Sequence, residues 1–169
     1  MSFRCFVVSV LAVACLSWGI PGAADAATRT VKDRSGEAPV QVDVVRAKLA
    51  NRDDRLVATV RLRRLQARVP NVYVEFEADA DNAWTYMFMS SFWRNGKYRT
   101  YIAYEDALGF NEYQCSGTKA RWNPGRRGTV KFTIPRECVG LPATVDFRGG
   151  AAIEGEVADR TRRITVAQG

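Results

Sequence analysis

The chain has 169 residues, a mass of 18.8 kDa and a net charge of +7, with 25 Lys and Arg against 18 Asp and Glu and no histidine. The absence of imidazole excludes Ser-His-Asp and Cys-His catalysis and any metal site that needs a histidine ligand. The length is that of one domain rather than two. The basic excess consists of 20 Arg and 5 Lys spread along the chain.

Residues 1–26 have the pattern of a signal peptide. A basic start is followed by an apolar run over 5–20, a Pro21-Gly22 break and the small-residue sequence Ala24-Asp25-Ala26. The run is shorter than the roughly 20 residues of a comfortable membrane span, so we expect export and no transmembrane anchor after cleavage. A secreted protein is the prediction. The alternative is a lipid anchor, because Leu11 to Cys15 resembles a lipoprotein box and would leave Cys15 lipidated.

Cleavage after Ala26 would leave two cysteines, Cys115 and Cys138. In an oxidising exterior such a pair predicts a disulfide. Closing a loop of this length stabilises a fold by about 3 kcal/mol in the chain-entropy model. Two reactive thiols are the alternative, but neither a CxxC motif nor a histidine supports it.

The rest of the chain reads as strands, after an N-terminal arm over 27–39 that is either an ordered edge or loose. Apolar residues alternate over 56–63 and again over 72–79, as in half-buried strands. Pairing of these two runs as a hairpin would place Arg61 and Arg63 beside Glu75 and Glu77. Opposite charges across two strands contribute about 0.2–1 kcal/mol for each pair. A first strand is expected over 42–49.

Asn95-Gly96 marks the clearest local prediction, a type I′ hairpin between strands over 84–94 and 97–104. With Arg94 facing Lys97, Trp93 lies beside Tyr98 on one face and other aromatic residues lie on the opposite face. Further strands are expected over 112–115, 129–134, 144–147 and 162–166, with loops at 123–125 and 149–150. The sequence therefore predicts an all-β, single-domain antiparallel β-sandwich over 40–169, immunoglobulin-like or jelly-roll-like, with seven to nine strands.

Short motifs occur toward both ends of the mature chain: Asp33-x-x-Gly36-Glu37-Ala38, Asp43-Val44, Asp53-Asp54, Cys115-x-Gly117 and Ile134-Pro135-Arg136-x-Cys138. With these motifs the chain resembles small exported bacterial β-sandwich proteins of unknown function. The resemblance implies an exported sandwich with one disulfide. It carries no activity and no catalytic residues that could be transferred to this chain.

Acidic residues crowd the strand over 74–81, where Glu75, Glu77, Asp79 and Asp81 project from one side. Paired carboxylates are the catalytic groups of glycoside hydrolases, so a small carbohydrate-active hydrolase is the alternative function. Asp79, Asp81 and Asn82 could instead bind calcium, the one cofactor considered, since hard oxygen ligands suit that ion. A solvated turn explains the same three residues.

Aromatic side chains are dense over 84–104, and Trp84, Trp93, Tyr98 and Tyr101 are candidate binding residues for a sugar. Rings on a sheet face offer apolar area with a polar tip. The alternative is that most of them form the core of the sandwich.

The densest arginine groups lie at 61–64, 126–127 and 160–163, separated by whole strands. We therefore expect dispersed charge and no nucleic-acid binding, with weak attraction to anionic envelope polymers or lipid headgroups. The sequence predicts a non-catalytic binding module of the cell exterior, whose partner is an envelope polysaccharide or another exported protein.

Overall fold

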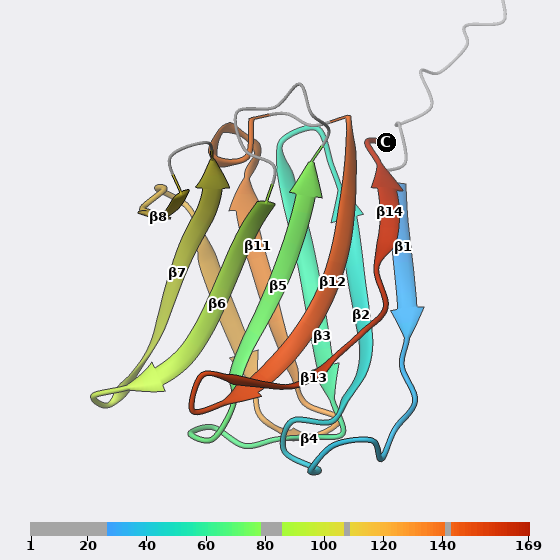
Figure 1. Ribbon diagram of the computed structural model, residues 1–169, viewed down its shortest axis with the longest axis vertical. Coiled ribbons are helices and arrows are strands. Elements are labelled where there is room, and N and C mark those ends of the chain that lie inside the picture. The colour runs from blue at the N-terminus through green and yellow to red at the C-terminus, as the bar shows by residue number, and fades with distance from the viewer. Residues whose placement is uncertain (1–26, 79–85, 107–108, 141–142) are drawn as a thin grey trace, which may run out of the picture.

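Two antiparallel sheets packed face to face make up the molecule (Figure 1). The computed structural model describes residues 27–169 except 79–85, 107–108 and 141–142. These residues form strands and one short 3₁₀ turn, η1 (Arg136–Cys138). They contain no helix that is long and apolar enough to cross a membrane. The predicted all-β, single-domain antiparallel sandwich is confirmed.

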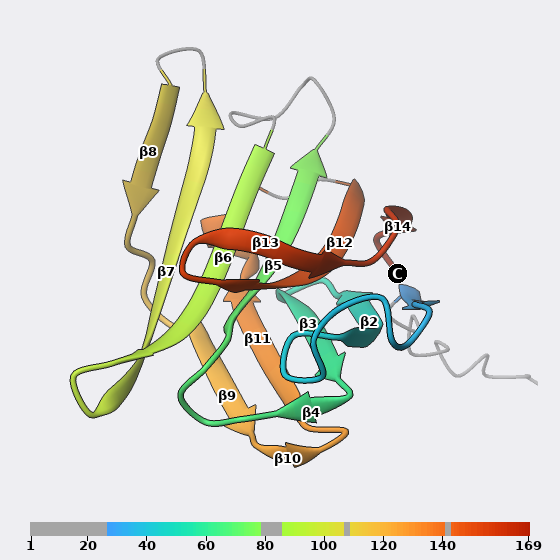
Figure 2. The ribbon, with the colours of Figure 1, turned by 60° about the horizontal axis from the view of Figure 1, so that its bottom comes forward.

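The smaller sheet has five strands. Their order is β1 (Ala27–Lys32), β2 (Val44–Asn51), β3 (Arg55–Leu62), β11 (Thr129–Pro135) and β9 (Lys119–Asn123). A separate two-stranded ribbon pairs β4 (Arg64–Leu65) with β10 (Gly125–Arg126) and lies at the bottom of Figure 2.

The larger sheet has seven strands. Its path runs through β13 (Glu156–Arg160), β12 (Thr144–Ile153), β5 (Asn71–Ala78), β6 (Tyr86–Arg94), β7 (Lys97–Asp106) and β8 (Gly109–Tyr113), while β14 (Ile164–Ala167) pairs with β12 as well. Because β14 pairs with residues 144–147 and β13 with residues 150–153, the two short strands share one edge of β12.

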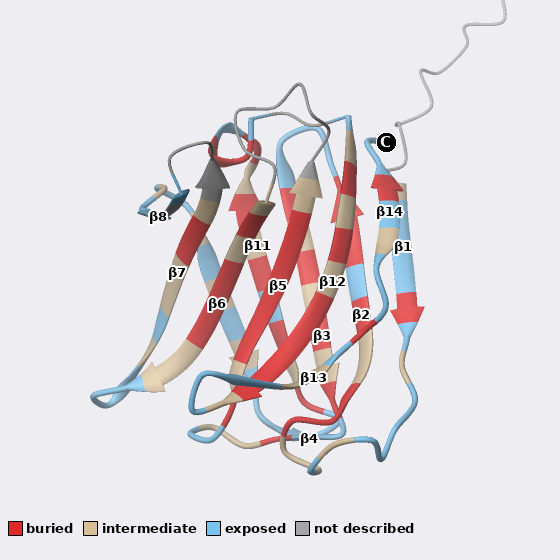
Figure 3. Ribbon diagram, in the orientation of Figure 1, coloured by how far each residue is buried: buried red, intermediate tan, exposed pale blue. Residues whose placement is uncertain are grey.

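The core lies between the sheets and follows the period of two that the sequence shows. On β3, Leu56, Ala58, Val60 and Leu62 are fully buried, whereas the residues between them face outward. Phe76 of β5 contributes to the core from the opposite sheet, and buried positions dominate the middle of β5 and β12 (Figure 3). Burial of one large apolar side chain contributes about 1.5–3 kcal/mol, so this double layer is the main source of stability.

The central hairpin forms as predicted. Arg94 pairs with Lys97 and Trp93 with Tyr98, and the register continues to Tyr86 and Glu105. Asn95 and Gly96 have φ angles of 51° and 81°, the left-handed values that a type I′ turn requires of both central residues.

The predicted hairpin between residues 56–63 and 72–79 is wrong. β3 and β5 belong to different sheets, and their apolar faces meet across the core instead of lying side by side. β3 pairs with β2 and β11, and β5 pairs with β12 and β6. Alternation tells which face of a strand is buried but not which strand lies beside it. Arg61 and Arg63 are therefore separated from Glu75 and Glu77.

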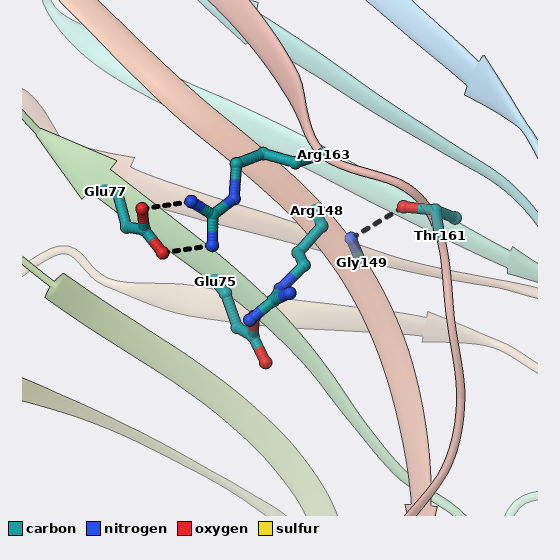
Figure 4. Close-up of polar contacts among 6 residues, drawn as sticks. All are labelled: Glu75, Glu77, Arg148, Gly149, Thr161 and Arg163. Carbon is teal, nitrogen blue, oxygen red and sulfur yellow. Dashed lines mark hydrogen bonds and ion pairs between the residues drawn. The ribbon is translucent and has the colours of Figure 1, made fainter.

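The loop predicted at Gly149-Gly150 is also wrong, since both residues lie inside β12. A Cβ on Gly150 would lie 2.3 Å from the ring of Tyr73, and one on Gly149 would lie 2.8 Å from Val60. Glycine inside a strand often marks such a close approach. The backbone of Gly149 also exchanges hydrogen bonds with Thr161, whose side chain accepts from Gly149 N at 3.2 Å (Figure 4).

The chain has more strands than expected. Residues 27–32 of the N-terminal arm take the first of its two alternatives and form the ordered edge strand β1, paired with β2. With β4, β9, β10 and β13, the described strands number fourteen, more than the seven to nine predicted. These additional strands are short or largely exposed, so their hydrophobic alternation is weak.

The disulfide between Cys115 and Cys138 is present, with Cα atoms 5.9 Å apart. It links the segment before β9 to η1 and so ties the end of β11 to the outer strand of its own sheet. Cys138 is buried, and Cys115 packs at the margin of the core.

Candidate functional site

A cleft of about 370 Å³ opens on the outer side of the five-stranded sheet, where the β4–β10 ribbon meets β3. We call it the arginine cleft. It is lined by Lys32, Asp33, Ser35, Val45, Arg46, Arg61, Arg63, Arg126 and Arg127.

Strand register brings three of the cleft's cations together. Lys32 of β1 pairs with Arg46 of β2, and Arg46 pairs with Arg61 of β3, so the three side chains stand in a row on neighbouring strands. A register shift between Val44 and Arg46 places Val45 beside Arg46 in the cleft lining. Like charges directly opposite each other on a sheet are destabilising. The folded protein therefore carries an electrostatic cost in this row.

A tight turn supplies the cations on the other side. Arg127 has a φ of 55°, a left-handed value uncommon for a residue with a side chain, and its N–H donates to Arg63 O at 3.0 Å. Gly128 follows, and a Cβ there would lie 2.5 Å from the side chain of Leu65. A left-handed backbone conformation at a non-glycine residue such as Arg127 costs about 1–3 kcal/mol, and such residues cluster at functional sites.

Carboxylates balance little of this charge. Arg63 Nη1 lies 3.6 Å from Oδ2 of the fully buried Asp43, an atom that also accepts from Gly36 N at 2.7 Å. Asp33 is the one carboxylate among the described lining residues. The Nε of Arg61 is buried and has no hydrogen-bond partner in the described part of the chain. A buried donor left unsatisfied costs about 1–3 kcal/mol.

The guanidinium groups in this cleft suit an anion. Each presents N–H donors in a planar fork that matches the oxygens of phosphate, sulfate or carboxylate. A bound anion would supply an acceptor near Arg61 and would relieve the repulsion between Arg46 and its neighbours.

The expectation of dispersed arginine charge is thus wrong for two of the three groups. Residues 61–64 and 126–127 are far apart in sequence, yet Arg61, Arg63, Arg126 and Arg127 line one cleft. The pairing of β4 with β10 joins the two groups. The third group lies elsewhere, with Arg163 ion-paired to Glu77. The sequence held one signal for this site, because the runs that form the five-stranded sheet contain no Asp or Glu.

Glu75 and Glu77, the candidate hydrolase pair, both have arginine partners from other segments (Figure 4). Arg148 Nε donates to Glu75, which is 6% exposed, and Arg163 pairs with the more accessible Glu77. These contacts give both carboxylates a structural role and leave Glu75 with little access to a substrate. The hydrolase interpretation stays a prediction with no further support from this geometry.

Two tyrosines beside Glu75 have perturbed acidity. Burial, with the negative charge of Glu75 as a second cause, raises the pKa of Tyr86 to about 12. The same two causes raise the pKa of Tyr73 above its ordinary value. Both phenols therefore remain protonated at neutral pH.

The candidate sugar-binding aromatics do not form one surface. Trp93 and Tyr98 lie on the inner side of the hairpin, where Tyr98 stacks on Trp122 of the opposite sheet at 4.4 Å between ring centroids. Tyr101 lies on the outer side, where its ring contacts Phe88 and Phe92, each at 5.9 Å. Trp84 lies outside the described residues. Trp93 and Tyr98 therefore belong to the interior, as the alternative of a core role predicts, while Tyr101 lies on the outer face, where a binding residue would be.

The predicted calcium ligands Asp79, Asp81 and Asn82 also lie outside the described residues. Among the residues that are described, no group of three or more acidic or cysteine side chains is placed to hold a metal ion.

Comparison with known proteins gives no relative, since no family model, curated protein or solved structure matches the chain.

Proposed function

We propose that the protein is a non-catalytic binding module of the cell exterior that holds an anionic ligand in the arginine cleft. Arg61 carries the proposal, because its buried Nε has no acceptor among the described residues, in a cleft whose described lining has six cationic side chains and one carboxylate. Leaving a buried donor unpaired is costly, and a ligand oxygen would remove that cost.

The chemistry of the lining favours binding over catalysis. Arginine stays protonated at physiological pH, so it holds charge and donates hydrogen bonds but does not serve as a general base. The described lining contains neither histidine nor cysteine. The cleft therefore supplies positions for an anion without a thiol or imidazole to attack it.

A location outside the cytoplasm agrees with two features of the chain. The first 26 residues have the order of segments that export requires. The Cys115–Cys138 disulfide is stable in an oxidising compartment. Of the predicted partners, an acidic envelope polysaccharide fits the charge of the cleft.

The test is a calorimetric titration with inorganic pyrophosphate and with citrate at low salt. We expect the double variant Arg61→Gln, Arg63→Gln to bind at least about tenfold more weakly, since a hydrogen bond to a charged group contributes about 1.5–3 kcal/mol. The matched control is Arg94→Gln, Arg99→Gln on the central hairpin, which removes the same charge from exposed positions of the other sheet. Equal affinity of the two double variants would refute a site in the cleft.

A further inference from the structure

We infer that the ligand is a linear polyanion that continues out of the arginine cleft and across the outer face of the five-stranded sheet. The inference rests on the proposed function and names the class of ligand that the same site would take.

The two sheets differ in charge. Every charged residue on the five strands of the smaller sheet is basic: Arg29, Lys32, Arg46, Lys48, Arg55, Arg61, Lys119, Arg121 and Lys131. The strands of the larger sheet carry both signs, with carboxylates that include Glu75, Glu77, Glu112, Asp146, Glu156 and Asp159 and with the cations Arg94, Lys97, Arg99, Arg148 and Arg160. A small anion needs only the few cations of the cleft. A surface with one sign of charge over a whole sheet also attracts a ligand that is charged along its length.

A second group of cations lies beyond the cleft on the same face. Lys131 of β11 pairs with Arg121 of β9, and Lys119 pairs with Thr133 one step further along β11. We call Lys119, Arg121 and Lys131 the distal cluster, and all three are exposed. Lys131 lies one strand and two residues from Arg61, roughly 8 Å, and Lys119 lies two strands and four residues away, roughly 17 Å.

Strand register makes the path between the two groups continuous. Lys48 pairs with Thr59, and Thr59 pairs with Lys131, so one row crosses β2, β3, β11 and β9 from Lys48 to Arg121. The row next to it holds Arg46 and Arg61 and leads into the cleft. Neighbouring strands are about 4.8 Å apart, so Lys131 and Arg121 are one strand apart, while Lys48 and Lys131 are two strands apart with Thr59 between them. A chain with repeated anionic groups reaches cations in both rows, whereas a small ion fills the cleft alone.

The outer face of the smaller sheet offers cations to a ligand and no exposed aromatic side chain. The two aromatic residues on its strands, Trp122 and Phe132, point inward, Phe132 fully buried and Trp122 stacked on Tyr98. Base recognition on single strands relies on exposed aromatic side chains. Interfacial binding to membranes relies on apolar residues that enter the headgroup region. No aromatic ring faces outward on these strands, and the outward-facing apolar residues are the half-buried Val45, Val57 and Pro135. A flexible soluble polymer is therefore the ligand that the surface fits.

The experiment compares tripolyphosphate with long-chain inorganic polyphosphate on the full chain. The distal variant is Lys119→Gln, Arg121→Gln, Lys131→Gln, and its control is Arg94→Gln, Lys97→Gln, Arg99→Gln, which removes equal charge from the other sheet. We expect the distal variant to keep its affinity for tripolyphosphate and to bind the long chain at least tenfold more weakly. Loss of three contacts should also reduce the slope of log affinity against log salt by about 2. Sulfated and uronate polymers in parallel titrations identify the preferred anionic group.

The outcomes separate the two proposals. If the distal variant keeps full affinity for the long chain, the ligand is confined to the cleft. If it loses affinity for tripolyphosphate equally, the distal cations act through general attraction and not through contacts with a polymer. In both cases the polymer inference fails while the proposed function stands. If the Arg61, Arg63 double variant binds both probes normally, both proposals fail. Tighter binding to oligothymidylate or to phosphatidylglycerol vesicles than to polyphosphate at equal anion concentration would overturn the choice of polymer. Unchanged thermal melting of the variants verifies that they fold.

Discussion

Neutralising Arg46 should make the unliganded protein more stable while weakening its hold on an anion. Arg46 stands between Lys32 and Arg61 on adjacent strands, so its charge faces a like charge on each side. Two unit charges about 7 Å apart in water repel by about 0.6 kcal/mol, and two such neighbours give about 1.2 kcal/mol. Arg46→Gln keeps part of the aliphatic stem and removes the charge.

The stabilisation by Arg46→Gln should decrease as the salt concentration rises. With Debye lengths of about 30, 8 and 3 Å, the repulsion should fall to about 1 kcal/mol at 0.01 M, about 0.5 kcal/mol at 0.15 M and about 0.1 kcal/mol at 1 M salt. Urea unfolding of both proteins at the three salt concentrations measures the difference in free energy of unfolding. Arg99→Gln, opposite Phe92 on the other sheet, is the matched control and should change stability little at any salt.

One result would refute the reasoning directly. If Arg46→Gln is less stable than the wild type at low salt, or if the difference does not shrink as salt rises, the three charges are not in repulsive contact. A bound anion would then have no repulsion among Lys32, Arg46 and Arg61 to reduce.

Three further predictions concern the larger sheet. Gly150→Ala should lower the free energy of unfolding by about 1–3 kcal/mol because its Cβ meets the Tyr73 ring, and a double-mutant cycle in urea with Tyr73→Ala should recover most of this loss. Glu75→Gln should cost about 2 kcal/mol because it removes a buried partner, whereas Glu77→Gln should change stability by under about 0.5 kcal/mol; equal costs would contradict the assigned burial. The free energy of unfolding should fall as pH rises from 10 to 12, since the phenol of Tyr86 ionises near its ordinary pKa of 10 when unfolded but only near 12 when folded. The Tyr86→Phe variant should have a flatter profile between those pH values, and an unchanged slope would count against this origin.

How far the sequence predicted this fold depended on whether a signal was local. The Asn95-Gly96 turn and the alternation on β3 need only nearby residues, and both predictions were confirmed. The choice of neighbouring strand is not local, and the pairing of β3 with β5 was wrong because any two alternating strands satisfy the same pattern. The sequence predicts a loop at Gly149 and Gly150, because their close approach to the other sheet and to Tyr73 arises only when the sheets pack.

The sequence does not predict the arginine cleft, because this site also depends on contacts that are not local. Lys32, Arg46 and Arg61 come together through the register of three strands, and Arg127 joins them through a two-residue ribbon too short to leave a sequence pattern. The net charge of the whole chain combines a basic sheet with one that carries both signs. The local signal for the smaller sheet is that the runs that form it lack carboxylates.

The difference in charge between the two sheets gives the molecule two unlike faces. On a layer of anionic polymer, the wholly basic strands of the smaller sheet would be attracted more strongly than the larger sheet, which carries both signs, so bound molecules would share one orientation. Each would then turn the outer rings of Phe88, Phe92 and Tyr101 toward the medium. Adsorption would in this way convert a randomly tumbling protein into an ordered coat whose outward surface is chemically different from the layer beneath it.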